Sequence, residues 1–89
     1  MGKRKIEDSN ILRALYFARG GHPDGVTRDF VVAKLGVNGI KTNGPQVGSY
    51  LADLERRGLV DSRHGYNEEA MKSTIFYWIT RNGTKELMK

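Results

Sequence analysis

The most constraining feature of this sequence is the junction at residues 54–63, LERRGLVDSR, where a helical pattern passes into a strand pattern across one glycine. Upstream, Val47, Leu51 and Leu54 recur at the spacing of one helix face. Downstream, LVDSR and STIFYWIT are rich in β-branched and aromatic residues, which is typical of strands. A polar loop of about ten residues separates these runs. The junction therefore predicts an amphipathic helix followed directly by a long-tipped antiparallel hairpin.

Two more helices are predicted ahead of this junction. The first covers about residues 8–19, where apolar side chains recur with helical spacing, and Asp8 or Ser9 is its N-cap. The second begins after Thr27, a good N-cap, lasts about eight residues and ends at Gly36. The turns between the helices are too short to divide the chain into two domains.

The helix before the junction and one after the hairpin complete the predicted order. The former covers about residues 45–57 and begins at Pro45, where the missing backbone N–H of proline has no cost. Thr80 can cap a short last helix that packs inward through Leu87. Gly83 inside this helix weakens it by about 1 kcal/mol relative to alanine. The expected fold is α+β, with three helices, a two-stranded hairpin and a short C-terminal helix.

Size and charge point to one small domain with an anionic partner. The domain is expected at residues 6–89, and its small core makes a homodimer a reasonable expectation. The net charge is +5 and the isoelectric point is about 9.7. Residues 1–5 form a basic tail, and the rest of the chain is only mildly basic. This excess favours a polyanionic partner, although the tail would serve equally to keep the protein in solution.

Other features argue against a membrane protein or an enzyme. No apolar run approaches the roughly 20 residues of a membrane span, and the basic start precedes an amphipathic segment rather than a signal peptide, so we expect a cytoplasmic protein. The chain has no cysteine for a disulfide or a thiolate metal site. His22 and His64 lie in separate predicted loops, and no catalytic or phosphate-loop motif is present. No catalysis, cofactor or metal is therefore expected.

Two longer motifs carry a resemblance to a known class of proteins. VGSYLADLERRGLVDSR resembles the recognition-helix-to-wing segment of winged helix-turn-helix transcription regulators. YWITRNGTKEL is similar to the second wing strand and following turn in regulators of the MarR, ArsR and PadR kinds. Together the two motifs cover about half of the chain. The resemblance implies a winged helix-turn-helix domain that binds double-stranded DNA as a homodimer and regulates transcription, more specifically as a repressor.

On this resemblance, the helix at about residues 45–57 lies in the major groove and reads bases through Gln46, Ser49 and Tyr50. Gln46 can pair with adenine, Ser49 can contact a base or a phosphate, and Gly48 has no side chain to hold the helix away from a duplex. The alternatives are that Gln46 and Ser49 are merely solvated and that Tyr50 is half in the core.

The charges at the end of this helix need a separate explanation. Asp53 near the groove repels phosphate, so it either accepts from a cytosine amine or pairs with Arg56 or Arg57 at helical spacing, and we favour the pairing. Cations in a last helical turn also suit the negative end of the helix dipole, worth about 0.3–1 kcal/mol. Arg56 and Arg57 are therefore not expected to contact bases.

Contacts to the DNA backbone are expected from other residues. They lie at the start of the second helix, in the loop before the third, and around the wing: Arg28, Lys41, Thr42, Arg63, His64 and Lys72. Glu68 and Glu69 at the wing tip argue against deep insertion into the minor groove, so contact is expected from the base of the wing.

Aromatic residues of the second strand suggest an interface. If Ile75, Tyr77 and Ile79 point inward, strand alternation turns Phe76 and Trp78 outward, where both rings would be exposed in a monomer. Such a patch would form a dimer interface or, as the alternative function, dock another protein. Equally, the last helix or the N-terminal segment would cover both rings.

Overall fold

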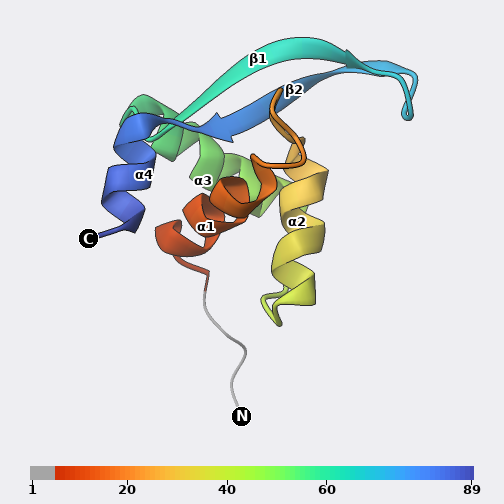
Figure 1. The fold of residues 1–89 in the computed structure, drawn as a ribbon. Coiled ribbons are helices and arrows are strands. Elements are labelled where there is room, and N and C mark those ends of the chain that lie inside the picture. The colour runs from red at the N-terminus through yellow and green to blue at the C-terminus, as the bar shows by residue number, and fades with distance from the viewer. Residues whose placement is uncertain (1–5) are drawn as a thin grey trace.

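The computed structural model describes residues 6–89, and the predicted basic tail at residues 1–5 lies outside the described residues. The elements follow one another as α1 (Asp8–Ala18), α2 (Arg28–Val37), α3 (Gly44–Arg56), β1 (Val60–Asn67), β2 (Lys72–Ile79) and α4 (Arg81–Leu87) (Figure 1). This order confirms the predicted α+β arrangement of three helices, a two-stranded wing and a short last helix.

The first two helices differ from their predicted ends. Glu7, not Asp8 or Ser9, is the N-cap of α1, and its backbone N–H donates to Asn10 Oδ1 over 2.7 Å. Thr27 caps α2 as predicted, accepting from the Phe30 N–H. The helix continues through Gly36, because the left-handed residue that ends it is Gly39, with φ of +83°.

The ends of α3 place it between the other helices and the wing. Asn43 Oδ1 accepts from the Gln46 N–H over 2.8 Å, and Pro45 lies in the first turn, where no donor is needed. At the other end Gly58 has φ of +78°, and Leu59 N–H donates back to Leu54 over 2.9 Å. Gly58 therefore ends the helix as predicted and turns the chain into β1.

The wing is longer and its tip shorter than predicted. The strands pair antiparallel from Val60 opposite Ile79 to Asn67 opposite Lys72, leaving only residues 68–71 in the turn. The prediction of a ten-residue loop was wrong, because the polar segment after Arg63 gains ladder hydrogen bonds although its side chains do not suggest a strand. His64 therefore lies in β1 rather than in a loop.

A short bridge also joins the α1–α2 loop to the wing. Val26 N–H donates to Tyr77 O over 2.9 Å, and Tyr77 N–H donates back to Val26 O over 2.8 Å. Gly25 beside it has φ of +96°, and a Cβ there would lie 2.8 Å from Tyr77 O. Glycine is therefore required where the loop meets β2.

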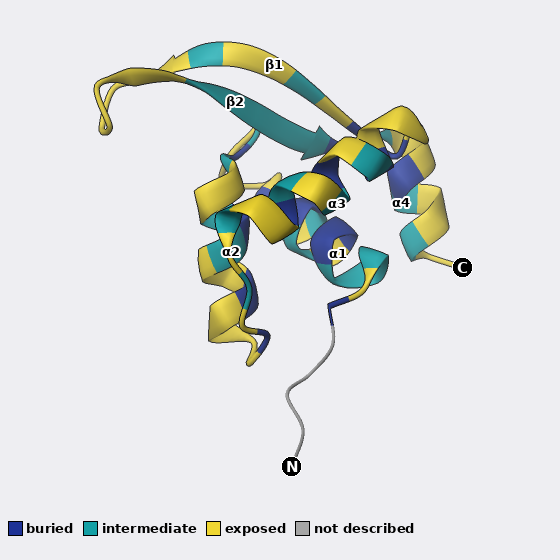
Figure 2. Cartoon of the chain, turned by 180° about the vertical axis from the view of Figure 1, so that it is seen from behind, coloured by how far each residue is buried: buried dark blue, intermediate teal, exposed yellow. Residues whose placement is uncertain are grey.

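The core lies between the three long helices and the base of the wing, and the distal wing extends beyond it (Figures 1 and 2). Its fully buried side chains lie at helical spacing on the three long helices, with one more at the start of β1: Ile11, Leu12, Leu15, Val31, Leu35, Val47, Leu51, Leu54 and Val60. No polar or charged residue is buried within residues 6–89. Hydrophobic burial is thus the main source of stability.

The last helix is held close to the hairpin base. Thr80 accepts from the Gly83 N–H over 3.0 Å and donates its own hydroxyl to Gly58 O over 2.8 Å. A Cβ on Gly83 would lie 2.1 Å from Leu59 O, so this glycine is a packing requirement that outweighs its lower helix propensity. Leu87 packs against the core, as predicted.

Candidate nucleic-acid interface

One edge of α3 is free of the core. Gln46 and Ser49 are exposed, while Val47 and Leu51 on the other side of the same helix are fully buried (Figure 2). Ser49 donates its hydroxyl to Pro45 O over 3.1 Å, and no residue in the range 6–89 hydrogen-bonds to the side-chain amide of Gln46, whose backbone N–H alone is bonded to Asn43. The side-chain amide of Gln46 is therefore available to a ligand.

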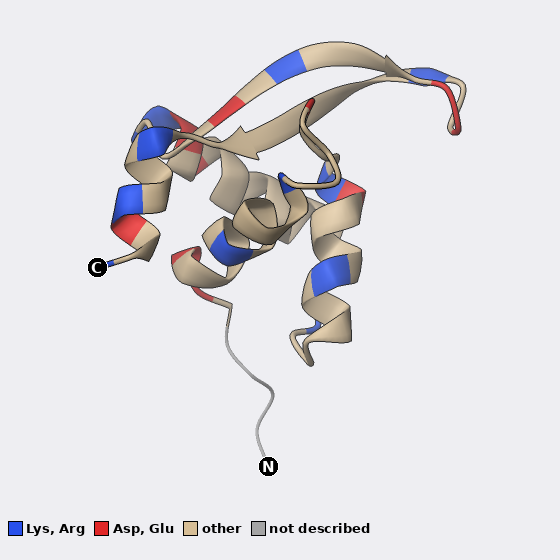
Figure 3. Cartoon of the chain, in the orientation of Figure 1, with Lys and Arg blue, Asp and Glu red and all other residues tan. Residues whose placement is uncertain are grey.

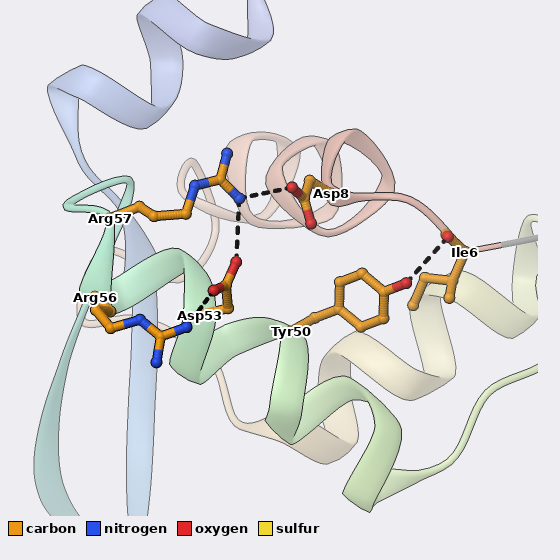
Figure 4. A network of polar contacts seen from close by, with 6 residues as sticks. All are labelled: Ile6, Asp8, Tyr50, Asp53, Arg56 and Arg57. Atoms are coloured by element: carbon orange, nitrogen blue, oxygen red, sulfur yellow. Dashed lines mark hydrogen bonds and ion pairs between the residues drawn. The ribbon is translucent and has the colours of Figure 1, made fainter.

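Tyr50 is oriented differently from these two residues. Its ring is half-buried against the core, and its hydroxyl donates to Ile6 O over 3.3 Å (Figure 4). Tyr50 is thus partly in the core, which was the alternative to base reading, and it links α3 to the segment before α1. Base reading by Tyr50 stays a prediction and would require this hydrogen bond to break.

The far end of α3 carries a charge network (Figure 4). Asp53 is paired with Arg56, and Arg57 Nη1 lies 2.7 Å from Asp8 Oδ2 and 3.2 Å from Asp53 Oδ2. Hydrogen bonds from the two arginines lower the pKa of Asp53, and those to the two carboxylates raise the pKa of Arg57. The predicted pairing of Asp53 is confirmed, and Arg57 additionally ties α3 to the start of α1.

Arg28 reaches α3 from the neighbouring helix. A Cβ on Gly44 would lie 3.0 Å from its guanidinium group, and a Cβ on Gly48 would lie 3.3 Å from its Cδ. The side chain therefore lies across the first two turns of α3, with Nε 4.0 Å from Asp29. We predict from the sequence that Gly48, lacking a side chain, lets a duplex approach α3. In the structure Arg28 occupies that space instead. Two glycines four residues apart were the signal for this close packing.

The other predicted backbone contacts do not form one cluster. Lys72 and Arg28 both line an open hollow of about 330 Å³ between α2 and the wing. Arg63 is exposed on β1, with its guanidinium 4.9 Å from the Phe76 ring, and the adjacent His64 is also exposed. Lys41 and Thr42 lie in the loop before α3, where Lys41 is exposed and the Thr42 hydroxyl is buried with no hydrogen-bond partner among residues 6–89.

Of the two alternatives for Phe76 and Trp78, full exposure does not hold. Both side chains are half-buried. Phe76 is covered across the hairpin, where Arg63 lies over its ring and a Cβ on Gly65 would lie 2.9 Å from it. Neither ring belongs to the large exposed hydrophobic side chains of the described chain. Their role in an interface stays a prediction.

The described residues also bear on metal and membrane sites. Between residues 6 and 89 no three His, Cys, Asp or Glu side chains are grouped closely enough to hold a metal ion. His22 instead packs edge-on against Phe30, with ring centroids 4.9 Å apart. No helix in the same range has the length and apolar character needed to cross a bilayer.

Three helices, a hairpin after the third and a bridge from the first loop to that hairpin define a winged helix. The solved structure of the S. aureus MepR–DNA complex is similar to 96% of this chain, with a TM-score of 0.61 and 25% sequence identity. A MepR mutant from a multidrug-resistant S. aureus clinical isolate is similar to 93% of it, with a TM-score of 0.57 and 20% identity. The chain spans about half of each, 52%. The sequence matches no family model and no curated protein.

Proposed function

We propose that this chain is a sequence-specific DNA-binding transcriptional regulator, and more specifically a repressor, whose recognition helix at about residues 45–57 enters the major groove of double-stranded DNA. The observation that carries the proposal is the exposed edge of α3, with Gln46 and Ser49 directed away from the core of a winged helix. Further support comes from the similar MepR structure, which was solved with DNA.

The proposed base contacts come from the first two turns of α3. The side-chain amide of Gln46 can donate to N7 of adenine through its NH₂ group and accept from the N6 amino group through its oxygen. Ser49 lies one turn further along the same edge. Since Asn43 already caps the helix, the Gln46 side chain is not needed for structure. We therefore assign Gln46 the main reading role and Ser49 a secondary one.

Arg28 is the proposed anchor on the flanking phosphate. It lies over the same two turns, remains partly exposed, and is only weakly held by Asp29. A guanidinium packed on the Gly44 and Gly48 side of α3 supplies a positive charge that the first half of the helix itself lacks. The remaining backbone contacts are proposed for the exposed Lys41, Arg63, His64 and Lys72, and for Thr42, whose buried hydroxyl would have to turn outward to reach a phosphate.

Two copies on a two-fold operator would place two α3 helices in successive major grooves, so a homodimer belongs to the proposal. The competing function, a module that docks another protein through Phe76 and Trp78, is less well supported because both rings are half-buried.

Selection of bound duplexes from a random pool tests the proposal. A two-fold motif with adenine at the position opposite Gln46 is the expected result. Affinity should also fall with salt by about 0.9 logarithmic units per phosphate contact and decade of salt. Recovery of no motif, together with an affinity indifferent to salt, would overturn the proposal.

A further inference from the structure

A groove between α1 and α2 plays no part in the proposed DNA interface. It encloses about 610 Å³ and is lined by these helices and the loops that follow them, with no described residue of α3. The two helices lie in front of α3 in Figure 1, whereas the exposed edge of α3 faces the viewer in Figure 2. A partner in this groove would therefore leave the reading edge free.

The walls of the groove mix polar side chains with unusually exposed apolar ones. Phe17 is 73% exposed and Val37 is 82% exposed, and both line the groove above the buried Leu35 and Ile40. Phe17 lies outside the apolar stripe that α1 turns to the core. Large apolar side chains gathered around one groove indicate a surface that is covered in the working state of the protein.

The rim of the groove is positively charged. Arg13 and Lys34 line it, and none of the described lining residues is acidic. Arg13 has no ion-pair partner within residues 6–89, and Lys34 lies 5.7 Å from the Phe30 ring, which forms part of the same wall. The groove therefore suits a segment that is both apolar and acidic.

The wing tip, residues 66–71, has this composition. Tyr66 is 57% exposed and Met71 is 75% exposed, and the Tyr66 hydroxyl lies 3.9 Å from Met71 Sδ. Between them, Glu68 and Glu69 give the tip a negative charge, seen in red at the end of the hairpin in Figure 3. These carboxylates make the tip a poor partner for phosphate, so DNA binding does not explain it.

We propose that the groove between α1 and α2 receives the wing tip of a second copy of this chain. Tyr66 and Met71 would cover Phe17 and Val37, while the two glutamates pair with Arg13 and Lys34. The tip cannot fill the groove of its own chain, because the paired eight-residue strands hold it away from α1 (Figure 1). If two copies exchange tips, the contact closes as a two-fold dimer; one-way contacts continue into longer chains.

This inference gives a surface to the self-association that the proposed function requires, but it is tested without DNA. Sedimentation equilibrium of the whole chain at low salt should show reversible association. Glu68→Lys with Glu69→Lys, or Arg13→Glu with Lys34→Glu, should each weaken it about tenfold or more, as expected for two reversed charge pairs. An equimolar mixture of these two variants should regain association, since each then offers the complement of the other.

The matched control is Arg81→Glu with Lys85→Glu, which reverses two exposed charges on α4 and should leave association unchanged. Circular dichroism establishes that each variant is folded. A monomeric wild type at all concentrations would overturn the inference, as would a mixture that fails to associate or a groove variant that is impaired when the tip variant is not. Gln46→Ala should leave association intact, so a failure of DNA reading is distinguishable from a failure of this contact.

Discussion

The two ends of α3 use their polar residues in opposite ways. In the first two turns, Gln46 is exposed with a free side-chain amide, and the positive charge over these turns comes from Arg28 of another helix, which packs at Gly44 and Gly48. In the last two turns, Arg57 is engaged by Asp53 and by Asp8 of α1. The arginines at the C-terminal end of α3 are thus structural. The candidates for DNA recognition lie at the N-terminal end, where the helix itself carries no charged residue.

The largest effect is expected at the free end. Gln46→Ala should lose about 1–3 kcal/mol of discrimination at one base pair, because a bidentate contact to adenine is removed. Competition binding with duplexes that vary at that position measures the loss. Asn82→Ala, which removes an exposed amide from α4, is the matched control. Equal losses in both variants would remove the distinction between the two ends of α3.

Arg28→Ala should weaken binding to all sequences alike and reduce the salt slope by about one, as for one lost phosphate contact. Gly48→Leu should have a similar effect, because its side chain displaces Arg28 from α3. Fluorescence anisotropy over a salt series measures both. Arg81→Ala on α4 is the control, and an unchanged slope in Arg28→Ala would contradict the role as anchor.

At the other end, Arg57→Ala should lower the melting temperature slightly while leaving base preference unchanged. Its ion pair with Asp8 links residues far apart in the chain, but both side chains are solvent-accessible, and exposed pairs contribute little. Thermal unfolding followed by circular dichroism measures the change. A shift in base preference with no loss of stability would show that Arg57 contacts DNA instead.

The smallest effect concerns pH. Arg56 and Arg57 hold the pKa of Asp53 below its ordinary value of 3.8, so the folded state binds fewer protons than the unfolded chain. The stability that the ionised Asp53 contributes is fully present above the pKa of the unfolded chain. It disappears as pH falls through the lower pKa of the folded state. The free energy of unfolding, measured with urea from neutral to acid pH, should therefore fall more steeply in the wild type than in Asp53→Asn. Parallel curves would exclude the network as a source of acid sensitivity.

Local patterns in the sequence predicted most of the fold. Helical spacing identified the buried faces of α1 and α3, and Thr27, Gly58 and Thr80 marked helix ends, because caps and stripes depend on neighbours within a few residues. The wing tip was mispredicted because backbone pairing, which side chains do not encode, stabilises a polar strand.

The site depends more on contacts between distant segments. The packing of Arg28 over Gly48 and the bond from Tyr50 to Ile6 join residues that no local period connects. Strand alternation left open whether Phe76 is exposed or covered by a terminal segment, whereas in the structure cross-strand neighbours half-cover it. The exposed edge at Gln46 followed from helical spacing, but its isolation from the charged end of α3 required the structure.

The most direct test is an NMR titration of the labelled chain with a selected duplex. The account predicts that the largest amide shifts fall at residues 43–49 and at Arg28, with little change in the α1–α2 groove around Phe17. Shifts concentrated in that groove, with residues 43–49 unaffected, would contradict the claim that the exposed edge of α3 lies on DNA.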